Sequence, residues 1–177
     1  MSIEKTQLFQ NSTATKLLFH GSKEEVQYPE VRKGKFTKDF SWGFYCTDIP
    51  LQACRWADRF KEPGVISVYT FREDSTLKHL KFEVTTDDWL DFVVSCRLGN
   101  IHAYDIVEGP MADDKIFNYV QNFIDGNITR EAFWELIKFQ HPTHQISFHT
   151  LSALGTLTFI ESMDSKECIA KYGEVSQ

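Results

Sequence analysis

Short segments in which apolar residues alternate with polar ones, or run together among β-branched and aromatic residues, recur along the whole chain. Such segments are typical of strands when glycine, proline or aspartate bounds them. Six of them predict strands, at 16–20, 44–47, 65–71, 103–107, 145–149 and 156–160. The segment 77–83 has the same character and predicts a further strand.

Between these strands, apolar residues recur every three to four positions, which is typical of amphipathic helices. Aspartates at the start of one such segment and Gly99 at its end are typical helix boundaries. Residues 22–41 are polar and predict a loop. The predicted helices lie at 48–60, 87–99, 113–126 and 129–140.

Strands at both ends of the chain with helices between them indicate an α+β fold. The strands are short and are mostly not separated by crossover helices, which favours a split, mainly antiparallel sheet with flanking helices. A chain of 177 residues is long enough for one domain with a sizeable core. We therefore interpret 1–177 as a single domain, in which 1–15 form a loose lead-in and 166–177 a tail that is either a short helix or frayed.

Charge and cysteine content narrow the classes of function. A net charge of −6 excludes the broad basic field that drives non-specific nucleic-acid binding. The four cysteines have no C-x-x-C spacing, and no apolar run approaches the length of a membrane span. These features predict reduced thiols in a cytoplasmic protein. The sequence also lacks G-x-G-x-x-G and P-loop motifs, so a bound nucleotide would require another device.

Two motifs offer binding chemistry at strand ends. In His20-Gly21-Ser22, the histidine either makes one structural hydrogen bond or presents a ring nitrogen to a ligand hydroxyl. Gly21 either permits a turn or lets a flat ligand reach its backbone N–H and C=O. In the segment GFYCT, Tyr45 is either a buried strand residue or a platform on which a planar heterocycle stacks.

Histidines and cysteines suggest two further kinds of site, both of which the pattern disfavours. His141, His144 and His149 lie close in sequence, but Pro142 interrupts them and no helical H-E-x-x-H arrangement is present. We therefore predict no metal site. A cysteine paired with His20 as a nucleophile is the other alternative, although free cysteines are usually buried small hydrophobes.

Acidic residues in the segment EGPMADD are the remaining candidates. Asp113 and Asp114 directly precede an apolar helical run, where they would cap the helix and complement its dipole. The alternative is that one of them, or Glu108, reaches a reactive centre beyond the Gly-Pro turn.

The order of these motifs resembles a known class of enzymes. LLFHGS at 17–22, followed by WGFYCTDIPLQACRWA at 42–57, is similar to ADP-ribosyltransferases of the poly(ADP-ribose) polymerase and diphtheria-toxin class. That class carries a His-Tyr-Glu triad, whose third residue starts a late strand. The resemblance places the triad at His20, Tyr45 and Gln145, with glutamine in place of glutamate. Residues 17–159 also resemble a bacterial family of uncharacterised domains thought to be ADP-ribosyltransferase-like.

The resemblance implies NAD as co-substrate. The backbone of Gly21 would grip the nicotinamide carboxamide with help from Ser22, and His20 would bind a hydroxyl of the adenosine ribose. Tyr45 would stack on the nicotinamide ring beside Phe44, which completes the expected cofactor-binding set. Gln145 would accept a hydrogen bond from the ribose 2′-hydroxyl.

The glutamine leaves three alternatives open, because an amide bears no charge and cannot act as a general base. The acceptor of ADP-ribose is already nucleophilic and needs little help, or an acid such as Asp113 or Asp114 supplies what Gln145 lacks. Otherwise the domain binds NAD, ADP-ribose or a partner protein without efficient transfer. We favour an enzyme that transfers ADP-ribose to a protein or nucleic acid. By analogy with its class, it would be a toxin or defence effector restrained by an antitoxin protein.

Overall fold

The computed structural model describes residues 15–34, 38–59, 64–112, 114–138 and 142–173. Within these residues, strands and helices are interspersed along the chain, which begins with a strand and ends with a helix. The strands are β1 (Thr15–Ser22), β2 (Phe44–Cys46), β3 (Val65–Arg72), β4 (His79–Lys81), β5 (Ile106–Gly109), β6 (Gln145–Phe148) and β7 (Leu157–Met163). The helices are α1 (Pro50–Ala57), α2 (Asp87–Arg97), α3 (Asp114–Ile124), α4 (Arg130–Ile137), α5 (Leu151–Leu154) and α6 (Ser165–Tyr172).

The strands form two sheets that meet at one bridge. One sheet has the order β1-β3-β7 and the other β2-β6-β5-β4. All pairs are antiparallel except β4 with β5. Phe19 and Thr47 join the sheets, because the N–H of each donates to the carbonyl of the other at 2.8 and 2.9 Å. The predicted α+β class with a mainly antiparallel split sheet is therefore confirmed.

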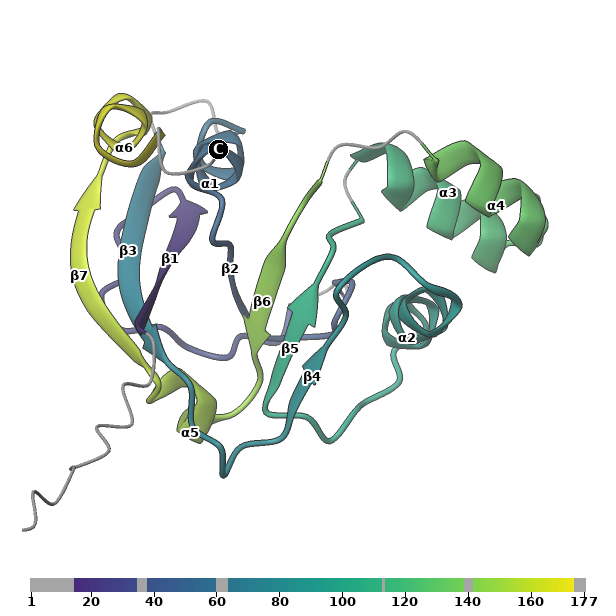
Figure 1. Cartoon of the computed structure of the whole chain (residues 1–177), viewed down its shortest axis with the longest axis horizontal. Coiled ribbons are helices and arrows are strands. Elements are labelled where there is room, and N and C mark those ends of the chain that lie inside the picture. The colour runs from purple at the N-terminus through teal and green to yellow at the C-terminus, as the bar shows by residue number, and fades with distance from the viewer. Residues whose placement is uncertain (1–14, 35–37, 60–63, 113, 139–141, 174–177) are drawn as a thin grey trace, which may run out of the picture.

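Each sheet has its own helical cover (Figure 1). Helices α1 and α6 lie beside the three-stranded sheet, where α1 contacts β1. Helices α2, α3 and α4 lie beyond the four-stranded sheet and enclose a core with buried Trp89, Val120 and Phe133. The two sheets thus keep separate helix partners.

Side-chain caps explain several helix starts. The hydroxyl of Thr86 accepts from the Trp89 N–H at 3.2 Å, and Asp87 and Asp88 occupy the first turn of α2. Asp164 and Glu167 form a capping box at α6. The sequence predicted a tail at 166–177 that is either a short helix or frayed. The capping box shows that the part up to Tyr172 is a helix.

Several predicted boundaries shift. The strand predicted at 103–107 begins only at Ile106, although the Asp105 N–H already donates to the Lys78 carbonyl at 2.9 Å and the Asp105 carbonyl accepts from the His149 N–H at 2.8 Å. The helix predicted at 87–99 ends at Arg97, since Gly99 has a φ of +91°. The segments predicted at 77–83 and 156–160 are β4 and β7, with their bounds moved. Helix α5, which Thr150 caps, was not predicted.

Among the described residues, no helix has both the length and the apolar character needed to cross a bilayer.

Candidate active site

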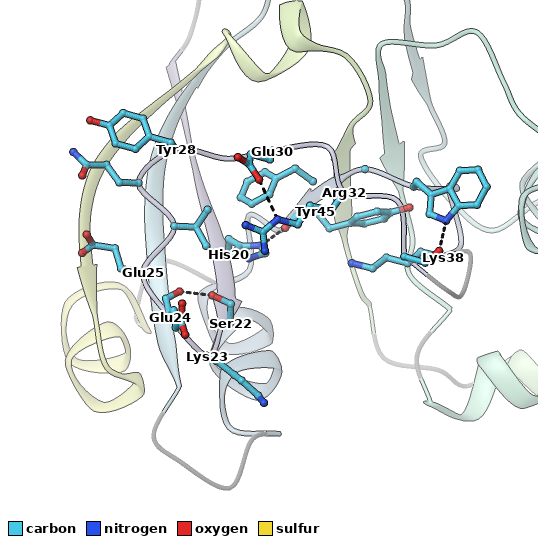
Figure 2. Close-up of a pocket in the computed structure, with 16 residues that line it drawn as sticks. His20, Ser22, Lys23, Glu24, Glu25, Tyr28, Glu30, Arg32, Lys38 and Tyr45 are labelled. Atoms are coloured by element: carbon cyan, nitrogen blue, oxygen red, sulfur yellow. Dashed lines mark hydrogen bonds and ion pairs between the residues drawn. The ribbon is translucent and has the colours of Figure 1, made fainter.

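A cleft of about 720 Å³ opens where β1 ends and β2 begins. His20 and Ser22 line it from β1, and Phe44 and Tyr45 line it from β2. The remaining lining residues come from the segment between these strands, which Figure 2 shows passing across the cleft with Glu30 and Arg32. Two segments 25 residues apart in sequence therefore form one concave surface around His20 and Tyr45.

His20 is held in one tautomer by the neighbouring strand. Its Nδ1 lies 2.6 Å from the carbonyl oxygen of Tyr45. Since a carbonyl can only accept, Nδ1 carries the proton. Burial lowers the pKa of His20 to about 4, so the ring is neutral near pH 7. Its Nε2 is then an unprotonated acceptor, suited to a hydroxyl donor.

Gly21 lies between two lining residues, and on the edge of β1 that faces away from β3 its backbone has no hydrogen-bond partner among the described residues. Phe19 directs its N–H and C=O toward Thr47, the residue directly after β2, and these groups alternate in direction along a strand. The N–H and C=O of Gly21 therefore face the same side as those of Phe19, away from β3. A Cβ at Gly21 would lie 2.0 Å from the Ala53 carbonyl oxygen of α1. Packing against α1 thus requires glycine here, whether or not a ligand binds.

Tyr45 is at once a wall of the cleft and part of a helix-covered core. Only 6% of it is exposed, and burial raises the pKa of its hydroxyl well above the usual value. The hydroxyl donates to the Ser41 carbonyl at 2.6 Å and accepts from the Phe40 N–H at 3.2 Å. The Nζ of Lys38 lies 4.5 Å from the ring centroid. A ligand that stacked on that face would replace Lys38.

Phe44 and Ser22 complete the predicted cofactor-binding set in the cleft. The Phe44 and His20 rings lie 4.4 Å apart between centroids, so Phe44 supports the imidazole. The Ser22 hydroxyl donates to the Glu24 carbonyl at 2.6 Å and thereby shapes the start of the loop.

Gln145 stands apart from the other two triad residues. It is only 4% exposed and is not among the residues that line the cleft. Ser147 is the register partner of Tyr45, so Gln145, two positions earlier on β6, lies on the same face of the sheet as Tyr45. The structure thus brings His20 and Tyr45 together in the cleft and places Gln145 in the adjoining interior.

Asp39 is a buried acid that the sequence analysis missed. Its Oδ2 accepts from the Gln145 Nε2 at 3.1 Å and from the Ala112 N–H at 2.9 Å. Its Oδ1 accepts from the Arg97 Nε and Nη2 at 3.1 and 2.5 Å. In the sequence, Asp39 is one polar residue of a predicted loop, and its place before the aromatic segment FSWGFY was the only available signal.

The backbone after Asp39 is unusual. Ser41 has a φ of +71°, which is uncommon for a residue other than glycine. Such a conformation costs on the order of 1 kcal/mol and persists where the surroundings enforce it. Here the Ser41 carbonyl receives the Tyr45 hydroxyl, while its N–H donates to the Lys38 carbonyl at 3.0 Å. The segment 39–41 therefore contacts both Tyr45 and Gln145.

The acids predicted to assist catalysis are placed differently. Asp113 lies outside the described residues; α3 begins at Asp114, whose side chain is likewise outside them. Glu108 is buried in an ion-pair network, with Lys16 Nζ at 3.1 Å and His144 Nε2 at 2.9 Å. Although burial opposes ionisation, hydrogen bonds with His144 and His79 lower the pKa of Glu108. The Glu108 carboxylate thus forms ion pairs within the fold.

The histidines and cysteines weighed for other chemistry are also engaged elsewhere. His144 lies between Asp48 and Glu108, whereas His149 bonds to the Trp42 carbonyl at 2.8 Å. His141 lies outside the described residues, and those described include no cluster suited to a metal ion. Burial raises the pKa of the Cys46 and Cys54 thiols, which opposes a thiolate nucleophile.

Comparison with known proteins gives one family. The family described as "Protein of unknown function (DUF3990)" matches residues 16–159. No curated protein and no solved structure matches the chain.

Proposed function

The chain belongs to the DUF3990 family, which is described as one of unknown function, and we propose from its cleft that it is an NAD-dependent ADP-ribosyltransferase. One observation carries the proposal: a neutral His20, fixed by the Tyr45 carbonyl, lies beside the open backbone edge of Gly21 in a cleft of about 720 Å³. The cleft volume lies within the usual range for small-molecule and cofactor sites.

In the proposed complex, different residues of the cleft bind different parts of NAD. The Gly21 N–H and C=O pair with the nicotinamide carboxamide, which has a matching acceptor and donor. His20 Nε2 accepts from a hydroxyl of the adenosine ribose, and the Tyr45 ring flanks the nicotinamide once Lys38 moves aside. Breaking the nicotinamide–ribose bond develops positive charge at the anomeric carbon, which firm holding and nearby acceptors stabilise.

Release of nicotinamide tests the proposal. The full chain is incubated with NAD, and free nicotinamide is measured over time for the natural protein and for His20→Ala. The matched control is His149→Ala, since His149 is also a buried histidine bonded to a backbone carbonyl, with its pKa lowered by burial to about 4, but does not line the cleft. We expect release by the natural protein and the control, and none by His20→Ala. Equal release by all three would exclude this site.

A second candidate function is binding without efficient transfer. The burial of Gln145 and the absence of a carboxylate at that position favour it. The protein would then bind NAD, ADP-ribose or a partner protein in the same cleft. Calorimetry distinguishes the two functions, because a binding module would take up NAD in a His20-dependent manner and release no nicotinamide.

Acceptor, compartment and partners complete the proposal. We infer a cytoplasmic protein, since Cys46, Cys54, Cys96 and Cys168 are all free thiols. Cell extract incubated with NAD labelled in its adenylate part, followed by separate protease and nuclease digestion, would identify a protein or nucleic-acid acceptor. The role of a toxin or defence effector with an antitoxin partner rests on the resemblance to the class.

A further inference from the structure

Gln145 is held in one orientation by neighbours that can only accept hydrogen bonds. Its Nε2 lies 3.1 Å from Oδ2 of Asp39 and 3.4 Å from the Pro110 carbonyl oxygen. A carboxylate and a carbonyl have no proton to donate, so only the NH₂ side of the amide can face them. The amide oxygen, Oε1, is therefore turned away from Asp39 and Pro110.

Asp39 is itself rigidly fixed. Its side chain is 9% exposed and that of Arg97 only 4%. Arg97 grips Oδ1 through two nitrogens, while its Nη1 donates to the Phe117 carbonyl at 3.0 Å. The Ala112 N–H occupies Oδ2 together with Gln145. The carboxylate consequently cannot rotate without breaking a buried ion pair.

We propose that Asp39 is a positioning residue for the reaction proposed above, and that it fixes the amide of Gln145 so that Oε1 accepts from the ribose 2′-hydroxyl of NAD. The inference rests on the proposed function. A hydrogen bond from the amide to a carboxylate also draws electron density toward Oε1, because hydrogen-bonded groups polarise one another. Asp39 and Gln145 together thus act where related enzymes use one glutamate.

The same segment couples this pair to the cleft. Phe40 and Ser41, the two residues after Asp39, supply the N–H and the carbonyl that hold the Tyr45 hydroxyl. The positive φ of Ser41 shows that this segment adopts an unusual backbone conformation while it makes both contacts. Asp39 therefore links the orientation of Gln145 to the position of the cleft wall.

Exchanging the carboxylate and the amide between the two positions, by Asp39→Asn and Gln145→Glu, tests the inference. In Asp39→Asn, Arg97 takes the remaining oxygen of the introduced amide, whose NH₂ then faces the NH₂ of Gln145. The glutamine amide flips and Oε1 is lost as an acceptor for NAD. In Gln145→Glu, two carboxylates face each other. In the double variant, the introduced carboxylate accepts from the introduced amide with one oxygen and presents the other oxygen to the ribose.

The expected pattern is two impaired single variants and an active double variant. Nicotinamide release per folded molecule should fall about 100-fold in Asp39→Asn, comparable to the loss of one preorganised polar group at a reacting centre. NAD affinity, measured by calorimetry, should fall far less than the release rate, because Oε1 contributes only one hydrogen bond to bound NAD and the larger loss lies in kcat. The Ala112 N–H loses its acceptor in both variants that carry Asp39→Asn, so this cost cancels between them.

The controls separate positioning from stability. Asp105→Asn removes a carboxylate that likewise accepts a backbone N–H and a side-chain donor, but lies away from Gln145. It should lower the melting temperature and leave release per folded molecule unchanged. All rates are compared below the lowest melting temperature. If Asp39→Asn alone does not fold, the comparison of Gln145→Glu with the double variant still shows whether adding Asp39→Asn restores activity.

The outcomes distinguish this inference from the proposed function. A natural protein that neither binds NAD nor releases nicotinamide overturns both. A natural protein that releases nicotinamide, with a double variant no better than Gln145→Glu, overturns the positioning role alone. Unchanged release per folded molecule in Asp39→Asn has the same meaning, because Asp39 would then serve stability only.

Discussion

Gly21 is a residue on which both packing and ligand binding place a requirement. Its backbone edge is open toward the cleft side, while the space where a side chain would start is filled by α1. In many binding motifs, the presence of glycine is ascribed to the ligand. Here the close approach of Ala53 is sufficient reason for it, and the ligand contact is a separate property of the same backbone.

Substitution of Gly21 by alanine should therefore destabilise the fold even without NAD. The new Cβ would lie 2.0 Å from the Ala53 carbonyl oxygen and 2.9 Å from the Ala57 nitrogen, both backbone atoms of a helix. We expect a loss of about 3 kcal/mol in the free energy of unfolding, measured with urea. Gly173→Ala is the control, since its Cβ would meet only the end of the Ile169 side chain at 3.4 Å. Equal stability of the two variants would contradict the packing argument.

Tyr45 requires a more careful substitution than alanine, because its ring belongs to the core. Tyr45→Phe keeps the ring and removes the hydroxyl that joins the Ser41 carbonyl to the Phe40 N–H. We expect a loss of about 2 kcal/mol in the free energy of unfolding, with NAD affinity retained. Urea unfolding and calorimetry measure the two quantities. A loss of NAD binding at unchanged stability would assign the hydroxyl, rather than the ring, to the ligand.

At the scale of elements, the apolar pattern predicted most strands and helices, because burial on one face imposes its period on the sequence. It misplaced the strand at 103–107, since β5 begins only at Ile106, directly after Asp105, whose side chain accepts from the Lys78 N–H and the Thr150 hydroxyl. Such contacts join residues 27 and 45 positions apart, which no local period encodes. The short helix α5 was missed for a related reason, since four residues make little more than one turn.

The candidate site was predictable only in part. The His20-Gly21 and Tyr45 motifs lie at strand ends, where local pattern and spacing are informative. Asp39 lies in a loop and gains its role from Arg97 and Gln145, which are 58 and 106 positions away. A polar loop residue that becomes buried by distant partners leaves no periodic signal, so only the fold identifies it.

The ion-pair network around Glu108 joins elements of both sheets and gives a prediction at this scale. Lys16 comes from β1, His79 from β4, and His144 directly precedes β6. Glu108→Gln should lower the free energy of unfolding by about 2 kcal/mol, because it removes the buried carboxylate of the network and leaves Asp48 as the remaining counter-charge of Lys16 and His144. Glu135→Gln, which breaks the exposed pair with Lys138, should cost about 0.5 kcal/mol or less. Similar urea midpoints for both variants would show that the network adds nothing.

At the scale of the whole molecule, stability depends on pH through groups that the fold keeps in one protonation state. Burial lowers the pKa of His20 and of His149 to about 4 in the folded protein. The unfolded chain binds protons at both near pH 6.5. Their contribution to stability is therefore complete above pH 6.5 and is lost as the pH falls toward 4. His144 acts in the opposite sense: despite its burial, hydrogen bonds with Asp48 and Glu108 raise its pKa, so its contribution is complete below pH 6.5 and is lost at higher pH.

The two neutral histidines outnumber the charged one, so acidification should destabilise the protein. Each neutral histidine contributes about 3 kcal/mol between pH 6.5 and 4, and His144 does not offset this loss, because its own contribution is already complete below pH 6.5. Asp48 adds to the loss only below about pH 4, because its pKa is lowered to about 2: burial opposes this shift, but hydrogen bonds with His144 and Lys16 exceed it. Urea midpoints measured from pH 8 to 4 should decrease once the pH is lower than 6.5. In His149→Gln the free energy of unfolding should depend less steeply on pH, because one proton fewer is taken up on unfolding. A natural protein equally stable at pH 6.5 and 4.5 would mean that His20 and His149 titrate normally. The neutral Nε2 acceptor on which NAD binding depends would then be lost near pH 6.5.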